Sequence, residues 1–203
     1  MAKTLAAPRI GCLAWGSLLW DPRTLPLAAA FEHDGPLLPI EFSRVAFDGR
    51  VTLVIDPLGA AVRTYWAPLA VDGLAGAVEA LALREGVASE RVADWIGVEA
   101  RPGFGESAGQ ATQAVRAVVA EWLAARPLDA VLWTALPARS PDGRFVRPDW
   151  AELIDHLERL EGTPRARAEE YVRRAPAMLR TPNRLRFEAV FGWSPAVGVT
   201  GGD

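Results

Sequence analysis

Short apolar and alternating runs in the first third of the chain predict antiparallel strands. Residues 38–47 and 50–55 are rich in β-forming residues and flank Asp48-Gly49, which is typical of a two-residue hairpin turn. A second turn is expected at residues 56–59, and a third β-rich run covers residues 60–67. This order predicts an antiparallel meander.

Two further segments precede the meander. Residues 10–14 are continuously apolar, which predicts a buried strand. Residues 22–39 are rich in Pro, Ala and Leu, and we expect them to form a long surface connection. The strand at residues 10–14 therefore stands apart in the chain from the meander.

A helical period begins at Asp72, a suitable N-cap residue. An apolar stripe runs along this helix at Leu74, Val78 and Leu81, and one more turn brings it to Glu85. Gly86 is placed to end the helix. A carboxylate thus falls on the apolar face of the last turn, where charges are rarely found.

The second half of the chain is mainly helical in pattern, with one apolar strand over residues 130–136. Ser107 is expected to cap a helix that runs to about residue 125. Asp149, with Glu152 three residues later, predicts a capping box. Residues 86–107 carry no clear period.

Two patterns near the C-terminus complete the assignment. Thr163-Pro164 predicts a helix start, and this helix should end near Pro176. Residues 185–191 alternate like a strand, with a short helix as the alternative. The class is therefore α+β.

We expect a single domain over residues 1–203. It would consist of a β-rich half (8–86), a helix-rich half (107–193) and a flexible tail (194–203).

Composition excludes several classes of function. The net charge is −3, and the basic residues are spread along the chain, which argues against nucleic-acid binding. Cys12 is the single cysteine, so an internal disulfide is excluded, and the two histidines are far apart, so no metal site is expected. Neither a membrane span nor a signal peptide is evident, which predicts a cytoplasmic protein.

Two features of the sequence could carry chemistry. Gly16 lets the chain turn sharply after the first strand, and successive backbone amides in such a turn can bind an anion or a carbonyl oxygen. Glu85, if it is withdrawn from water at a helix C-terminus, could act as a general acid and base. The alternatives are an ordinary strand end, and a glutamate that reaches solvent or pairs with Arg84.

Three ordered segments resemble the γ-glutamylcyclotransferase-like superfamily, and most closely its ChaC, glutathione-specific branch. Residues 14–20 resemble the family's Gly-Tyr-Gly-Ser-Leu-Ile-Trp. Residues 51–59 resemble Val-Thr-Leu-Val-x-Asp-Pro-x-Gly, and residues 83–85 resemble the Phe-Arg-Glu that holds the catalytic glutamate. Order and spacing agree over residues 10–86, and the resemblance implies a small mixed β-barrel with packed helices.

The resemblance also implies an activity without a cofactor or metal. The α-amine of a γ-glutamyl amide or peptide attacks its own γ-carbonyl and releases 5-oxoproline, with Glu85 moving the protons. The implied substrate-binding residues lie in the turn: Ala14, Trp15, Gly16, Ser17, Leu18 and Leu19. Arg44 or Tyr171 could contact the substrate α-carboxylate, against the alternatives of a surface ion pair for Arg44 and core packing for Tyr171.

The chain departs from the family pattern in two places. Trp15 stands where the family has Tyr, and the Gly/Pro-rich segment of the glutathione branch is absent. A glutathione substrate is therefore less favoured than cyclotransferase chemistry itself, and a γ-glutamyl group on a specialised amine is an alternative donor. A second alternative is a non-catalytic small-molecule-binding or interaction domain of the same fold.

Overall fold

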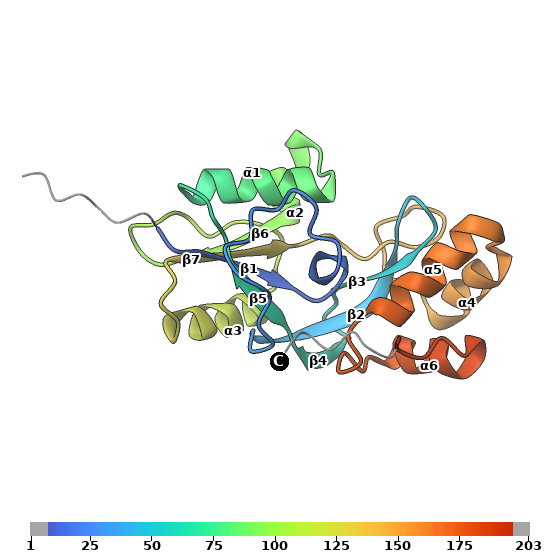
Figure 1. The fold of residues 1–203 in the computed structure, drawn as a ribbon. Coiled ribbons are helices and arrows are strands. Elements are labelled where there is room, and N and C mark those ends of the chain that lie inside the picture. The colour runs from blue at the N-terminus through green and yellow to red at the C-terminus, as the bar shows by residue number, and fades with distance from the viewer. Residues whose placement is uncertain (1–7, 197–203) are drawn as a thin grey trace, which may run out of the picture. The chain divides into compact units, whose positions relative to one another are not determined.

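Two β-sheets, each packed against its own helices, make up the computed structural model, which describes residues 8–196 (Figure 1). The described residues form two compact units, each built from separate segments of the chain. The first contains residues 8–14, 22–36 and 64–135, and the second contains residues 15–21, 37–63 and 136–196. The expected tail lies outside the described residues from position 197 onward, and the single domain stays a prediction.

The first unit has a four-stranded sheet in the order β5-β1-β7-β6. Its strands are β1 (Ile10–Ala14), β5 (Tyr65–Pro68), β6 (Ile96–Ala100) and β7 (Ala130–Thr134). β1 pairs in parallel with β7 and antiparallel with β5, and β6 pairs antiparallel with β7. All five residues of β1 are buried, which explains its continuous apolar run.

Two helices cover this sheet. α1 (Leu74–Glu85) packs against β6 and β7, and α3 (Gln113–Ala124) packs against β6 from the other side (Figure 1). A short 3₁₀ turn, η2 (Ser89–Arg91), and α2 (Val92–Trp95) lead into β6. These elements fill most of the stretch over residues 86–107 that the sequence left unassigned.

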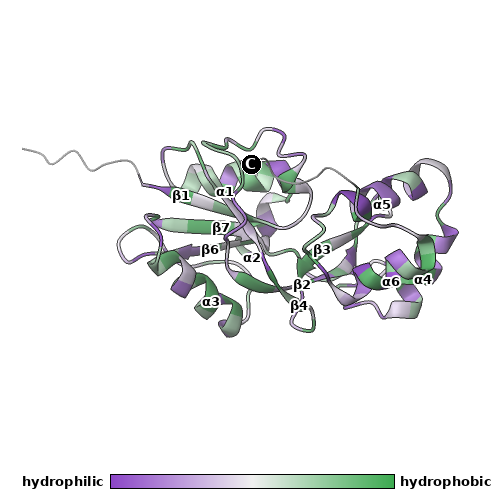
Figure 2. Ribbon diagram, turned by 60° about the horizontal axis from the view of Figure 1, so that its bottom comes forward, coloured by the Kyte–Doolittle hydropathy of each residue, from purple (hydrophilic) through white to green (hydrophobic). Residues whose placement is uncertain are grey.

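The second unit has a three-stranded antiparallel sheet in the order β3-β2-β4. Its strands are β2 (Leu37–Val45), β3 (Val51–Ile55) and β4 (Ala60–Arg63), and its helices are η1 (Ser17–Leu19), α4 (Trp150–Arg159), α5 (Gly162–Arg174) and α6 (Pro182–Phe191). α5 packs against β3, and α6 packs against β2. Figure 2 shows α5 as mainly hydrophilic, as expected of a helix with one buried side.

Several local predictions are confirmed. The hairpin of β2 and β3 forms, with Gly49 at φ 87°, although its loop spans residues 46–50 rather than two residues. Gly59 closes the second turn by donating to the Asp56 carbonyl at 2.8 Å. α1 ends at Glu85, with Gly86 left-handed, and α4 starts with the complete capping box of Asp149 and Glu152.

The prediction of a single third strand in the meander is wrong. Residues 60–67 form two strands, β4 and β5, which belong to different sheets. Thr64 separates them, because its amide and its hydroxyl both donate to the Pro36 carbonyl, at 3.2 and 2.8 Å. An alternation of apolar residues cannot reveal that the pairing partner changes within the run.

Two predicted N-caps are also wrong. Gly73, rather than Asp72, precedes α1 and makes no side-chain cap. α3 begins only after Thr112, whose hydroxyl accepts from the Val115 amide, whereas the Ser107 hydroxyl bonds Glu99 at 3.0 Å. Ser and Thr are both suitable N-cap residues and occur often along the chain, so residue type alone could not show that Thr112, rather than Ser107, caps α3.

The strand predicted over residues 185–191 is a helix, α6, as the alternative held. Thr181 caps it by accepting from the Arg184 amide, Pro182 occupies its first turn, and Gly192 ends it at φ 67°. These start and stop signals outweigh a short alternation. A third predicted N-cap, Thr163, is also wrong, because α5 begins at Gly162 and is preceded by Glu161, which makes no side-chain cap.

The class α+β is confirmed, with six α-helices and two small sheets among the described residues. Over residues 8–196 these sheets form no closed barrel, so the implied barrel is not confirmed. No helix within those residues is both long and apolar enough to cross a membrane.

Candidate functional site

Glu85 is the last residue of α1, in the first unit, and it is largely withdrawn from water. Its Oε1 atom accepts from Nη1 of Arg84 at 2.6 Å, and the two side chains are 15% and 4% exposed, respectively. The pairing with Arg84 that the sequence left open therefore occurs, and it occurs at a nearly buried position. The result is a shielded carboxylate at the end of the helix that retains a little solvent access.

The Glu85 carboxylate also acts on the Cys12 thiol of β1, in the same unit. Burial raises the pKa of Cys12 to about 12, the Glu85 carboxylate adds to that increase, and Arg84 opposes it. The Glu85 charge thus acts directly on the middle of β1. No group of three or more metal-ligating side chains occurs in the part of the chain that the structure describes.

The predicted turn follows β1 in the chain and belongs to the second unit. Gly16 precedes the 3₁₀ helix η1, and its carbonyl accepts the Leu19 amide at 3.0 Å, so Leu19 cannot offer that amide to a ligand without breaking the turn. The Ser17 carbonyl accepts the amides of Trp20 and Asp21. Within residues 8–196, no acceptor takes the amides of Gly16 and Leu18, which keeps them available as donors.

Tyr171 reaches this turn from α5. A Cβ atom placed on Gly16 would lie 2.6 Å from the Tyr171 hydroxyl oxygen, so the close approach requires glycine. The same oxygen accepts the Leu53 amide at 3.4 Å, and the Trp15 indole donates to the Leu53 carbonyl at 3.3 Å. Trp15 and Tyr171 therefore tie the turn to β3, and the Trp20 ring lies edge-on to Tyr171 at 5.3 Å.

Arg44 lies elsewhere in the second unit and is not at the surface. The residue is 6% exposed, and its Nη1 atom donates to the Pro137 carbonyl at 2.7 Å. The alternative of a surface position for Arg44 is therefore wrong. The residue lies on an inward-facing side of β2, where its side chain donates to a backbone carbonyl.

Arg50, which the sequence did not single out, lies against Tyr171 instead. Its guanidinium carbon is 5.4 Å from the centre of the tyrosine ring, and its Nε atom donates to Asp48 at 2.7 Å. Nothing in the sequence pattern indicates a functional role for this residue, because Asp48-Gly49-Arg50 is typical of a hairpin turn.

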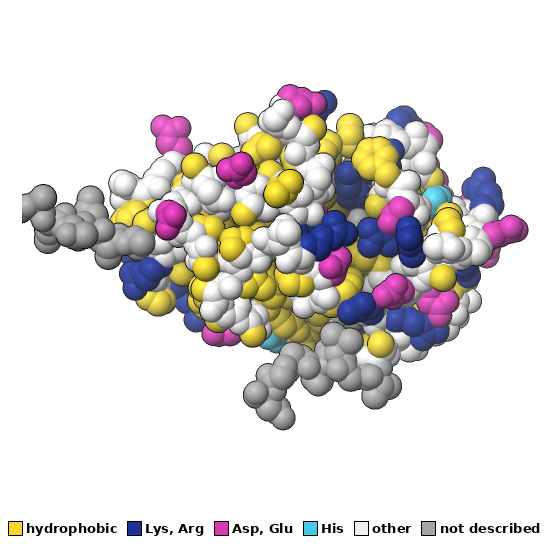
Figure 3. All heavy atoms as spheres, turned by 45° about the horizontal axis from the view of Figure 1, so that its top comes forward, with side chains coloured by type: hydrophobic (Ala, Val, Ile, Leu, Met, Phe, Trp, Pro, Cys, Tyr) yellow, Lys and Arg dark blue, Asp and Glu magenta, His cyan; other side chains and the backbone are white. Residues whose placement is uncertain are grey.

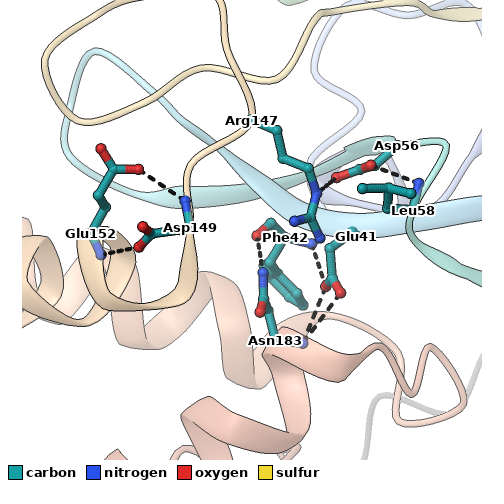
Figure 4. Close-up of polar contacts among 8 residues, drawn as sticks. All are labelled: Glu41, Phe42, Asp56, Leu58, Arg147, Asp149, Glu152 and Asn183. Atoms are coloured by element: carbon teal, nitrogen blue, oxygen red, sulfur yellow. Dashed lines mark hydrogen bonds and ion pairs between the residues drawn. The ribbon is translucent and has the colours of Figure 1, made fainter.

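A second buried carboxylate, Glu41 of β2, has a structural role (Figure 4). It accepts the amides of Phe42 and Asn183 at 2.8 and 3.3 Å and so satisfies the start of α6. Burial raises the pKa of Glu41, while these hydrogen bonds and Arg147 oppose the increase. Arg147 also pairs with the buried Asp56 at 2.7 Å, next to the second turn.

The surface also has a cavity, lined by none of the predicted site residues, and a face of mixed charge. A cavity of about 620 Å³ in the first unit lies between residues 99–104 and residues 120–124. Basic side chains lie beside acidic ones on the face shown in Figure 3. Along α5, Arg173 pairs with Glu169 and Arg174 pairs with Glu170.

The predicted residues thus divide between the units. Ala14 and Glu85 belong to the first, whereas residues 15–19, Arg44 and Tyr171 belong to the second. Within the second unit the structure brings Tyr171 to the turn and leaves Arg44 on the Pro137 carbonyl. A site shared by Glu85 and the turn stays a prediction.

Comparison with family models, curated proteins and solved structures finds no match to this chain.

Proposed function

We propose that this chain is a γ-glutamylcyclotransferase-like enzyme that releases 5-oxoproline from a γ-glutamyl amide or peptide. The observation that carries this proposal is Glu85, a carboxylate shielded from water and fixed by Arg84 at the end of α1. It acts electrostatically on β1, the strand whose chain continues directly into the Gly16 turn. The proposal brings this acid together with the amide donors of the turn that follows β1 in the chain.

The chemistry follows from these groups. The Glu85 carboxylate takes a proton from the substrate α-ammonium, and the freed amine nitrogen attacks the γ-carbonyl carbon. The amides of Gly16 and Leu18 stabilise the oxyanion that forms. Glu85 returns this proton to the leaving nitrogen as its bond to the carbonyl carbon breaks. The attacking nitrogen then gives up a second proton, which passes through Glu85 to the same leaving group, so that the products are the neutral five-membered lactam and an ammonium ion.

This reaction needs no enzyme nucleophile. Because the amine and the carbonyl belong to one substrate molecule, a pocket that enforces the bent conformer gains a large effective concentration. Tyr171 supports the turn from α5, and it supplies a hydroxyl beside Gly16 in a chain whose Trp15 has none. The described strands form two open sheets, and none of these residue roles requires a closed barrel.

Incubation of the purified protein with γ-glutamyl peptides, γ-glutamyl amines and glutathione, followed by mass spectrometry of 5-oxoproline, tests the activity. We expect Glu85→Gln to lower kcat by about 10²- to 10⁴-fold, the usual range for loss of a general acid–base group. Glu79→Gln is a matched control, because Glu79 lies on the same helix but is exposed. Undiminished turnover in Glu85→Gln would remove Glu85 from the mechanism.

A second candidate is a non-catalytic small-molecule-binding domain, which the Arg84–Glu85 pair favours because Arg84 already occupies the carboxylate. This function predicts ligand-dependent thermal stabilisation by 5-oxoproline or glutamate with no product from any substrate. Release of 5-oxoproline by the wild type alone, and not by Glu85→Gln, would exclude it.

A further inference from the structure

A γ-glutamyl substrate carries an α-carboxylate next to the amine that must attack, so its binding calls for a fixed cation. Arg44 is unsuited to this role, because its guanidinium is buried against the Pro137 carbonyl. Among the described residues, two arginines lie beside the predicted turn in the second unit. Arg174 lies over the Trp20 ring at 5.6 Å but already pairs with Glu170 through Nη1. Arg50, in contrast, has its guanidinium over Tyr171.

Arg50 is held in place along one edge. Asp48 accepts its Nε atom at 2.7 Å and its backbone amide at 3.3 Å, while the tyrosine ring supports the guanidinium face. The side chain remains 30% exposed, and over residues 8–196 no partner takes either Nη atom. A guanidinium fixed at Nε offers its Nη atoms to an incoming carboxylate without a large loss of side-chain entropy.

The position of Arg50 relates it to the turn through one side chain. The Tyr171 hydroxyl lies against Gly16, and the ring of the same tyrosine lies beneath Arg50. The amide donors at Gly16 and the cation are therefore separated by a single tyrosine. This arrangement suits a ligand with a carbonyl at one end and a carboxylate a few bonds away.

We propose that Arg50 binds the α-carboxylate of the γ-glutamyl group, with Asp48 and Tyr171 as its positioning residues. The assignment rests on the proposed function and names a specificity residue for it. Arginine can accept a carboxylate through two parallel hydrogen bonds, so a carboxamide in the same place should bind less well.

The experiment compares γ-glutamyl-alanine with the analogue whose glutamyl α-carboxylate is a carboxamide. We expect the wild type to prefer the carboxylate by at least tenfold in kcat/KM, mainly through KM, as expected for the loss of a charged hydrogen bond. Arg50→Gln should lose about that factor for the carboxylate substrate only, and Arg50→Lys should keep part of it. Arg186→Gln, which removes an arginine over the Trp150 ring at 5.1 Å, should leave the preference unchanged.

A binding measurement separates this assignment from the proposed function. Calorimetry with 5-oxoproline and 5-oxoprolinamide requires no turnover, and the carboxylate should bind at least tenfold more tightly in the wild type but not in Arg50→Gln. Arg50-dependent binding without product from any substrate would overturn the enzyme and leave the carboxylate site standing. Turnover with the same preference in Arg50→Gln would overturn the role of Arg50 alone, and the absence of both binding and turnover would overturn both proposals.

Discussion

The contact between Gly16 and Tyr171 allows a quantitative prediction. In Gly16→Ala, the added methyl carbon would lie 2.6 Å from the tyrosine hydroxyl oxygen, about 0.8 Å short of an ordinary 3.4 Å contact. Tyr171 cannot easily yield, because its oxygen bonds the Leu53 amide and its ring contacts Trp20. We therefore expect Gly16→Ala to lower the free energy of unfolding by about 1–3 kcal/mol, the usual cost of overpacking.

Removal of the hydroxyl should relieve this cost. In Tyr171→Phe the nearest ring carbon is the former hydroxyl carbon, 3.6 Å from the methyl position, which is a normal contact. The alanine substitution should then cost less than half as much, and the coupling energy between the two sites should be about 1 kcal/mol or more. The double mutant is thus predicted to be more stable than the sum of the single effects.

Urea unfolding of the four proteins measures this double-mutant cycle. Gly76→Ala is a matched control, because a Cβ atom there meets nothing within 4 Å, and within a helix the change should stabilise by about 0.5–1 kcal/mol. An equal cost of Gly16→Ala in both backgrounds, within about 0.5 kcal/mol, would refute the close approach of Tyr171 to the turn.

Two further predictions concern the buried acid and the buried thiol. Because burial raises the pKa of Glu41 above the ordinary value for a glutamate, the associated stability is present below the pKa of the unfolded state and is lost as the pH rises through the pKa of the folded state. The stability of Glu41→Gln relative to the wild type should therefore improve between pH 4 and pH 7 in urea titrations, and a pH-independent difference would contradict this. The Cys12 thiol, with a pKa of about 12, should resist a thiol reagent at pH 8 in the native protein and react after unfolding. Rapid labelling of the native protein would contradict the burial of Cys12 in β1.

Much of the local structure follows from neighbouring residues. Gly49 provides the positive φ of the hairpin loop, Gly86 ends α1, and Asp149 with Glu152 starts α4, since these signals depend on interactions within a few residues. The same signals at Thr181 and Gly192 identify α6, and the strand predicted there was wrong because a short alternation was given more weight.

Predictions that depend on distant partners were less successful. The run over residues 60–67 alternates smoothly, yet it divides at Thr64 between two sheets. Arg44 was expected at the surface and is buried, because the side of β2 that faces inward depends on what packs against it. The position of Arg50 against Tyr171 had no sequence signal, since an arginine after a turn is common and the contact depends on a residue about 120 positions away.

The sequence by itself determined the turn at Gly16, the helix that ends at Glu85 and the α+β class, because turns, caps and hydrophobic periods are properties of adjacent residues. Only the tertiary structure decided that the hydroxyl of Tyr171, about 150 positions after Gly16 in the chain, lies against Gly16. It also decided that the charge of Glu85 raises the pKa of Cys12. Such contacts depend on which apolar surfaces pack against each other and so become buried. That choice is made by the packing of whole elements and leaves no local pattern in the chain.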